Sequence, residues 1–277
     1  MKTYIEKHSI FGDTLFAQSG KIKIGIPLEF GIRISHLSYE EGENLFFEQP
    51  NSMTELSTPD GWRVRGGHRL WIAPESTDVY YPDNEPVSYE IKNEEIIITQ
   101  KNDPWLNIEK SMIISFISED SLKVVHKIKN TSAKTRRCSL WGVSSMAPDG
   151  TEYISLEVRD GGYDPFHKIS MWDYTSLGDE RVTYERELIT LKHRSTGKKY
   201  KIGVSHPKDC VKYINKGIVF EKRYNIEREK QYPDGDVSFE TFMCDHMVEV
   251  ESLSPLYDIK AGESASHTEI WNLHKSI

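Results

Sequence analysis

The sequence predicts an all-β fold, and three observations lead to that prediction. Apolar and polar residues alternate with a period of two in many segments, for example in 21–26, where Ile22, Ile24 and Ile26 fall on one face. Successive side chains of a strand point to opposite faces of a sheet, so this alternation is typical of strands. Short segments of turn-forming residues separate these stretches, and no long segment has clean helical spacing. A total of about 15 or more strands favours stacked sheets over a small barrel.

The expected strands can be placed along the chain in order. The alternating segments that predict single strands are 21–26, 31–35, 217–224, 237–243, 247–252 and 267–273. Three pairs of segments joined by short polar turns predict hairpins: 88–91 with 95–99, 111–117 with 122–129, and 188–193 with 200–205. One short helix is expected over 180–188.

The charge balance limits the classes of partner. The chain has 277 residues, with 35 Lys and Arg against 43 Asp and Glu, a formal net charge of −8. Nucleic acid is therefore not expected as a partner, because phosphate binding needs clustered cations. Residues 181–230 run the other way, with 14 Lys and Arg against 6 Asp and Glu. That segment predicts either the solvated faces of exposed strands or a patch that attracts an anionic ligand such as a sugar phosphate.

Composition also indicates the setting of the protein. Cys138, Cys210 and Cys244 are few and widely spaced, which predicts neither a disulfide framework nor a metal site. Residues 1–12 lack the apolar core of a signal peptide, and no run approaches 18 apolar residues. We therefore expect a cytoplasmic protein without membrane contact. No linker-like stretch divides the chain, so a single domain over residues 1–277 is expected.

Three segments resemble a known superfamily. The first is Gly31-Ile-Arg-Ile-Ser-His-Leu37, followed by a turn and Asn44. The second is Arg63-Val-Arg-Gly-Gly-His-Arg-Leu-Trp-Ile-Ala-Pro-Glu75. The third is Glu249-Val-Glu-Ser-Leu-Ser-Pro255, which leads into Ile259-Lys-Ala-Gly-Glu263 and a last strand. Together they resemble the aldose 1-epimerase, or galactose mutarotase-like, superfamily. The second segment is most similar to an uncharacterised branch with a Gly-Gly-His-Arg-Leu-Trp motif.

The resemblance implies a fold, a ligand class and an activity. The implied fold is the galactose mutarotase-like β-supersandwich, and the implied partner is a monosaccharide or a sugar phosphate, bound by a monomer or homodimer without a cofactor. The implied reaction is the interconversion of sugar anomers, which requires a base at the anomeric hydroxyl and an acid at the ring oxygen. A non-catalytic sugar-binding or sugar-sensing module on the same fold is the alternative. The superfamily places a histidine on the strand after its central Asn, whereas residues 138–146, after Asn130, contain none.

Catalytic roles are assigned through the resemblance. Glu251 is the expected base, and it shares strand parity with Glu249 and Met247, so these side chains should lie on one face. The alternative is that this face is simply solvated. His68, next to the Arg-Gly-Gly turn, is the expected acid, unless it is a structural histidine bonded to loop backbone.

Substrate contacts are expected from six further residues. Arg65 is expected to orient the substrate through its planar guanidinium, the alternative being an ion pair inside the loop. Trp71 is either a platform for a sugar face or a core residue. The expected substrate contacts are Arg65, Arg69, Trp71, Glu249, Tyr232 and Asp236. The last two belong to the segment 232–236, which otherwise predicts only a turn. No metal ligand set is predicted.

Overall fold

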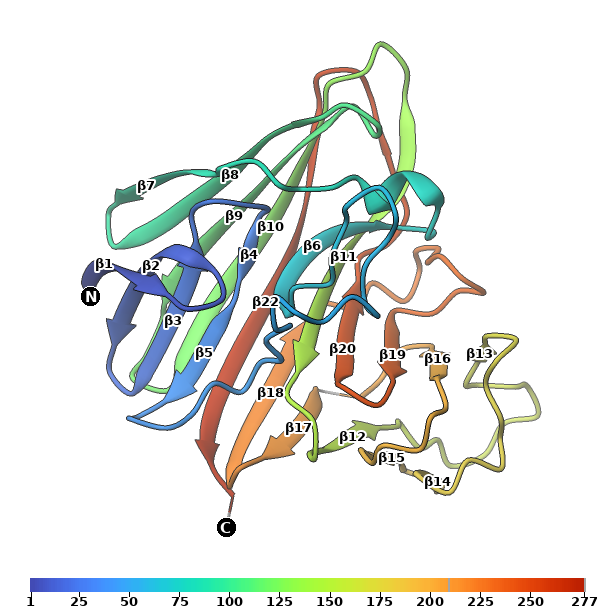
Figure 1. Ribbon diagram of the computed structural model, residues 1–277. Coiled ribbons are helices and arrows are strands. Elements are labelled where there is room, and N and C mark those ends of the chain that lie inside the picture. The colour runs from blue at the N-terminus through green and yellow to red at the C-terminus, as the bar shows by residue number, and fades with distance from the viewer. Residues whose placement is uncertain (209, 277) are drawn as a thin grey trace.

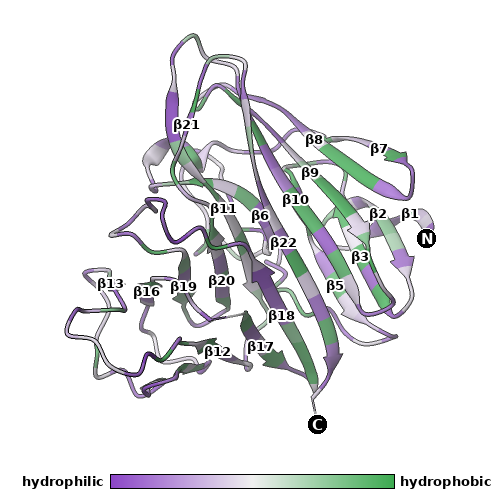
Figure 2. Ribbon diagram, turned by 180° about the vertical axis from the view of Figure 1, so that it is seen from behind, coloured by the Kyte–Doolittle hydropathy of each residue, from purple (hydrophilic) through white to green (hydrophobic). Residues whose placement is uncertain are grey.

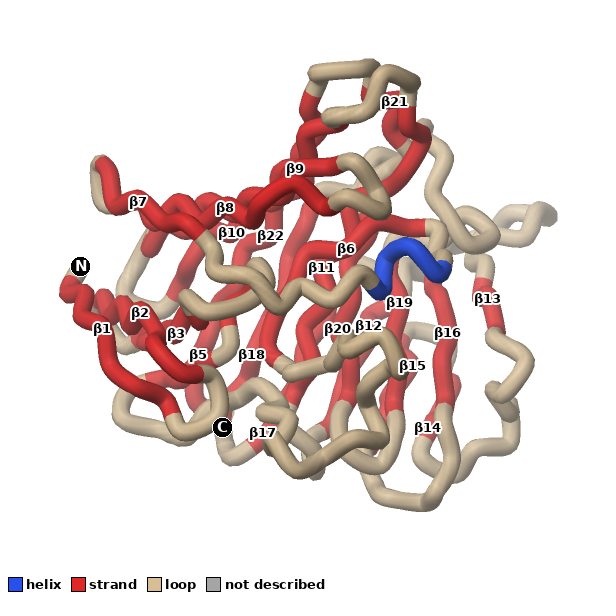
Figure 3. The backbone as a smooth tube through the Cα atoms, turned by 45° about the horizontal axis from the view of Figure 1, so that its top comes forward, coloured by secondary structure: helices blue, strands red, loops and turns tan. Residues whose placement is uncertain are grey.

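The computed structural model describes residues 1–208 and 210–276. Within them the chain forms 22 strands and one short 3-10 helix, η1 (Thr77–Tyr80), which lies beside the strands in Figure 3. All paired strands are antiparallel. No helix among the described residues has the length and apolar character needed to cross a membrane.

The strands form three sheets. The ten-stranded sheet contains, in spatial order, β14 (Val182–Tyr184), β15 (Leu188–Lys192), β12 (Thr151–Ser155), β17 (Val211–Asn215), β18 (Ile218–Tyr224), β22 (Ser264–Lys275), β10 (Ser121–Asn130), β9 (Ile108–Phe116), β8 (Glu95–Asp103) and β7 (Ser88–Lys92). The eight-stranded sheet contains β13 (Ile169–Met171), β16 (Tyr200–Val204), β19 (Phe239–Met243), β20 (Val248–Leu253), β11 (Arg136–Met146), β6 (Gly67–Ala73) and β4 (Arg33–Ile34), with β21 (Tyr257–Ile259) paired to β11. The four-stranded sheet contains β1 (Lys2–His8), β2 (Gly12–Ser19), β3 (Ile22–Pro27) and β5 (His36–Tyr39).

The two large sheets pack against each other, as Figure 1 shows. Alternation along each strand sends every second side chain into the space between them. The ten-stranded sheet contributes Met112 and Trp271 to this core, and the eight-stranded sheet contributes Leu70 and Val250, all of them buried. Apolar residues recur along the strands of both layers in Figure 2. The opposite face of the eight-stranded sheet is consequently free to carry a site.

The predicted strand pattern is largely confirmed, with two corrections. The hairpins β7–β8 and β9–β10 pair as expected. The helix expected over 180–188 is wrong, because Val182 and Tyr184 pair with β15 and extend the ten-stranded sheet. The hairpin expected from 188–205 is also wrong. β15 and β16 lie in different sheets, and the segment between them crosses from one layer to the other.

Candidate functional site

A cavity of about 600 Å³ lies on the outer face of the eight-stranded sheet. This volume is within the range of small-molecule sites. Its floor is made by odd-numbered residues of β6, β11 and β20, because the even-numbered residues of these strands point into the core. Four adjacent strands therefore present functional side chains to one space, those of Arg69, Trp71, Trp141, Glu249 and, from β19, Phe242.

Aromatic rings form one wall of the cavity. The ring of Trp71 lies 5.4 Å from that of Trp62, 5.2 Å from that of Tyr80 and 5.5 Å from that of Trp141, measured between centroids. Tyr174 also lines the cavity and is 43% exposed. Tilted and edge-to-face contacts at these separations are favourable and hold the rings in fixed orientations. The wall is therefore preorganised for a flat apolar face of a ligand.

Arg69, Glu249 and Ser145 form a hydrogen-bonded triad on the β6 side of the floor. The Arg69 guanidinium lies 4.2 Å from the Trp71 ring centroid, and its Nη1 is 3.0 Å from Glu249 Oε1. Ser145 completes the group, since its Oγ accepts a hydrogen bond from Arg69 Nη1 at 3.1 Å and donates one to Glu249 Oε1 at 2.8 Å. Both charges are largely buried and mutually compensated, so the triad presents oriented polar atoms with little net charge.

Lys201, on β16, is the second cation of the cavity. Its Nζ lies 2.9 Å from Glu240, 3.7 Å from Glu75 and 3.8 Å from Glu251, and it sits over the Trp141 ring at 4.7 Å from the centroid. Burial alone would lower the pKa of Lys201, but the three carboxylates outweigh it and raise that pKa above its ordinary value. Lys201 therefore stays charged, which excludes it as a neutral-amine nucleophile near pH 7.

Glu251 lies directly beneath the floor and is fully buried. Its Oε2 accepts a hydrogen bond from the indole Nε1 of Trp141 at 2.8 Å, and its Oε1 has no hydrogen-bond partner among the described residues. Burial raises the pKa of Glu251 to about 7. Glu240, its Cα partner on β19, is also buried and lies 2.9 Å from Lys201 Nζ. A carboxyl that titrates near neutral pH therefore touches two residues of the lining, Trp141 and Lys201.

The structure brings four of the sequence-predicted residues to this region. Arg69, Trp71 and Glu249 line the cavity, and Glu251 contacts its lining from below. The predicted strand parity is confirmed, because Met247 and Glu249 both line the cavity whereas Val248 and Val250 belong to the buried core.

Arg65, Tyr232 and Asp236 do not line the cavity. The Arg65 guanidinium stacks on Phe30, 3.9 Å from the ring centroid, in a separate depression. The sequence could not show that Arg65 lies outside the cavity, because this depends on the backbone of Arg65, Gly66 and Gly67. All three have positive φ and turn the chain between this depression and the cavity. Tyr232 is 2% exposed and accepts a hydrogen bond from the backbone, and Asp236 pairs with Lys168 at 2.5 Å.

His68 also lies outside the cavity, because its even position on β6 turns it into the space between the sheets. It is fully buried, where Nδ1 accepts a hydrogen bond from the Ser144 hydroxyl at 2.8 Å and Nε2 lies 2.6 Å from Nε2 of His126. Nδ1 of His126 donates to the carbonyl of His267 at 3.1 Å, so its Nε2 accepts the hydrogen bond from His68. Burial lowers the pKa of His68 well below the ordinary value. This neutral, enclosed imidazole has no path to a ligand in the cavity.

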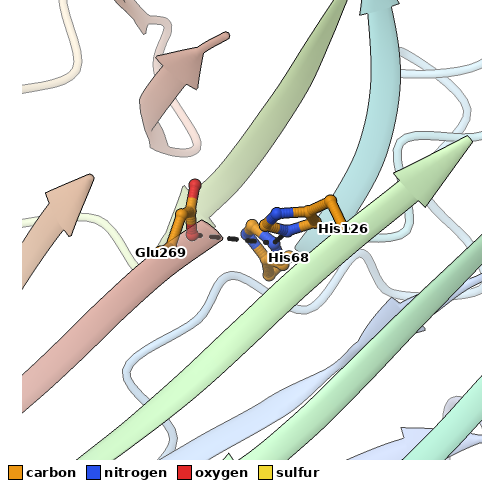
Figure 4. A group of neighbouring side chains, drawn as sticks. All are labelled: His68, His126 and Glu269. Carbon is orange, nitrogen blue, oxygen red and sulfur yellow. Dashed lines mark hydrogen bonds and ion pairs between the residues drawn. The ribbon is translucent and has the colours of Figure 1, made fainter. Parts of the chain in front are cut away.

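His68, His126 and Glu269 are close enough to raise the question of a metal, as Figure 4 shows. Two nitrogens bound to one zinc at tetrahedral angles would lie about 3.3 Å apart, which is longer than the 2.6 Å between these two. Glu269 is already compensated by Lys222, whose Nζ lies 3.1 Å from Oε1. The cluster thus fits a hydrogen-bonded network better than a metal centre.

Several lining residues were not singled out as ligand contacts from the sequence, among them Lys201, Trp62 and Tyr174. Lys201 lies between Tyr200 and Ile202, which are both buried, and so interrupts the apolar run of β16. A lysine inside such a run is the sequence signal that could have identified it as a site residue. Trp62 and Tyr174 lie outside the strands, and nothing local in the sequence places them next to β6. Of the basic segment 181–230, Lys199 and Lys201 line the cavity.

Comparison with solved structures identifies the fold. No protein-family model and no curated protein matches the chain. Among solved structures, a galactose mutarotase-like protein from Lactobacillus casei has a TM-score of 0.62 at 10% identity, covering 94% of this chain and 100% of its own. A galactose mutarotase-like protein from Clostridium acetobutylicum has a TM-score of 0.56 at 10% identity, covering 99% of each chain. At these identities the likeness concerns the fold alone, and the chain has the galactose mutarotase-like fold.

Proposed function

We propose that this protein binds a monosaccharide in the cavity of the eight-stranded sheet. The observation that carries the proposal is the combination of a preorganised aromatic wall with a floor of oriented charged groups. A pyranose has apolar C–H faces that pack on aromatic rings, and hydroxyls that hydrogen-bond to carboxylates and guanidinium groups. The neighbours of the same fold are described as galactose mutarotase-like proteins, which also supports a sugar ligand.

A neutral sugar fits the cavity better than a sugar phosphate. The two cations of the floor are already paired, Arg69 with Glu249 at 3.0 Å and Lys201 with Glu240 at 2.9 Å. A phosphate would have to compete with these carboxylates, and Glu75 adds a further negative charge to the lining. Lys199, at the exposed rim, is the cation best placed for an anionic substituent.

Anomer interconversion is the second candidate function, favoured by Glu249, a carboxylate within the cavity. It can accept the proton of the anomeric hydroxyl, while an acid donates a proton to the ring oxygen, the ring opens, and reclosure occurs on the other face. No histidine lines the cavity in the described part of the chain. Tyr174, 43% exposed in the lining, offers a phenol as the candidate donor, and burial raises its pKa to about 12, so that it stays protonated at neutral pH. Glu251 would act indirectly, through Trp141 and Lys201.

Two NMR measurements test these functions. Saturation-transfer difference spectra with glucose, galactose, xylose, fucose and glucose 6-phosphate should show binding of at least one neutral sugar, lost in Trp71→Ala and kept in Tyr89→Ala. Tyr89 is a matched control because it is a 40% exposed aromatic on β7, an edge strand of the ten-stranded sheet, and does not line the cavity. Absence of binding by every sugar would refute the proposal. Exchange spectroscopy of the same sugars then reports anomer interconversion. Acceleration that Glu249→Gln abolishes supports catalysis, whereas binding without acceleration favours the non-catalytic module.

A further inference from the structure

An exposed tryptophan stands next to the cavity without belonging to it. Trp105 lies in the turn between β8 and β9 and is 43% exposed. It lines a second depression, of about 690 Å³, together with Pro59, Asp60, Thr77 and Asp78. A single exposed aromatic is common on protein surfaces, but this ring lines a depression beside the cavity together with polar side chains, the combination that small-molecule sites use.

The Trp105 turn is held rigidly. Oδ1 of Asp103 accepts hydrogen bonds from the backbone N–H groups of Trp105 and Leu106, both at 3.0 Å. Asp103 is itself buried, 3.6 Å from Lys110. The indole ring meets Tyr81 edge-to-face, with 5.4 Å between centroids and 69° between planes. A ligand that stacks on this ring therefore finds it already in place, at little cost in conformational entropy.

The second depression adjoins the cavity. Both are lined by Thr58 and Tyr80, so the two spaces meet at these residues. On the cavity side, the Tyr80 ring belongs to the aromatic wall, 5.2 Å from Trp71. On the far side, Asp60 and Asp78 offer exposed carboxylates as hydrogen-bond acceptors beside Trp105. The same combination of a ring face with nearby acceptors thus occurs twice, side by side.

We infer that the natural ligand is a glycoside of at least two sugar units rather than a free monosaccharide. The inference rests on the proposed sugar binding: one unit occupies the cavity, and the next stacks on Trp105 with its hydroxyls directed at Asp60 and Asp78. The carboxylates beside the ring disfavour an apolar occupant such as a lipid chain, because they would lose their hydration without gaining hydrogen bonds. Trp105 is a specificity residue for chain length and makes no contact with the unit in the cavity.

Paired titrations test the inference. Calorimetry would compare glucose with maltose and cellobiose, and galactose with lactose and melibiose, on the wild type, on Trp105→Ala and on the control Tyr89→Ala. In at least one pair we expect the disaccharide to bind about tenfold more tightly than its monosaccharide, a difference that Trp105→Ala removes. Trp105→Ala should leave monosaccharide affinity within about twofold of the wild type, and Tyr89→Ala should behave as the wild type throughout.

The outcomes separate this inference from the proposed function. If monosaccharides bind, but no disaccharide binds more tightly, or the gain survives Trp105→Ala, the inference is overturned and sugar binding in the cavity stands. If no sugar of either length binds the wild type, the proposed function itself fails. Thermal unfolding of Trp105→Ala serves as the check that the turn is intact, since the hydrogen bonds to Asp103 Oδ1 are donated by backbone N–H groups and persist in the variant.

Discussion

Replacing Lys222 by Met should destabilise the protein severely. Lys222 is fully buried between the sheets, where Nζ lies 3.1 Å from Glu269 Oε1 and donates hydrogen bonds to the carbonyls of Gly142 at 3.1 Å and Val250 at 2.8 Å. Met has a similar length but no charge, so Glu269 would keep a buried negative charge without its cation. Breaking a buried ion pair from one side costs about 3–5 kcal/mol. That is a large share of the stability of most domains, about 5–15 kcal/mol.

Urea unfolding at pH 8 and pH 5 measures the effect. Burial by itself would raise the pKa of Glu269, but Lys222 holds it well below the ordinary value. Without Lys222 that pKa rises, Glu269 is more readily protonated in the folded state, and the loss should be smaller at pH 5 than at pH 8. The double variant Lys222→Met/Glu269→Gln should regain most of the lost free energy. A loss below about 1 kcal/mol at pH 8, or no recovery in the double variant, would refute the reasoning.

Two further predictions concern the buried carboxyl of Glu251 and the glycine turn that precedes β6. The folded-state pKa of Glu251, about 7, lies above the ordinary value of 4.5, so its contribution to stability is lost as pH rises through this interval. Glu251→Gln should therefore reduce the loss of unfolding free energy between these two pH values by up to about 3 kcal/mol. An unchanged pH profile of urea unfolding would contradict this. Gly66→Ala should destabilise far more than Gly197→Ala, measured by thermal unfolding. Both glycines have positive φ, which costs Ala about 1–2 kcal/mol, but a Cβ on Gly66 would lie 1.8 Å from the carbonyl oxygen of Phe47, whereas Gly197 faces open space. Equal losses would show that close packing at Gly66 is unimportant.

The fold could be predicted because its signal is local. Alternation such as that of Ile22, Ile24 and Ile26 depends only on neighbours in the sequence, and those side chains are indeed fully buried. The errors arose where pairing is non-local. Val182 to Tyr184 is too short to identify as a strand until β15 lies beside it, and the break between β15 and β16 depends on which sheet each strand joins.

The candidate site was predictable only in part, for the same reason. Strand parity placed Glu249 correctly on the outer face, because parity is a property of one strand. Parity within β6 also separates Arg69 and Trp71 from His68, but which face of β6 carries the cavity depends on the layer packed against it. The meeting of Lys201 with Glu240, Glu251 and Glu75 involves β16, β19, β20 and the loop after β6, an arrangement invisible without strand order.

The most direct test of sugar binding in the cavity uses the tryptophan indoles as reporters. Trp62, Trp71 and Trp141 line the cavity, whereas Trp271 is fully buried between the sheets, where its Nε1 donates to Glu269 at 2.6 Å. In ¹⁵N-labelled protein titrated with the neutral sugars and their disaccharides, with signals assigned by single Trp→Phe variants, the account predicts saturable shifts of the cavity indole signals and a stationary Trp271 signal. If no cavity indole responds to any sugar, or if Trp271 shifts as much as the others, the site proposed for this protein is contradicted.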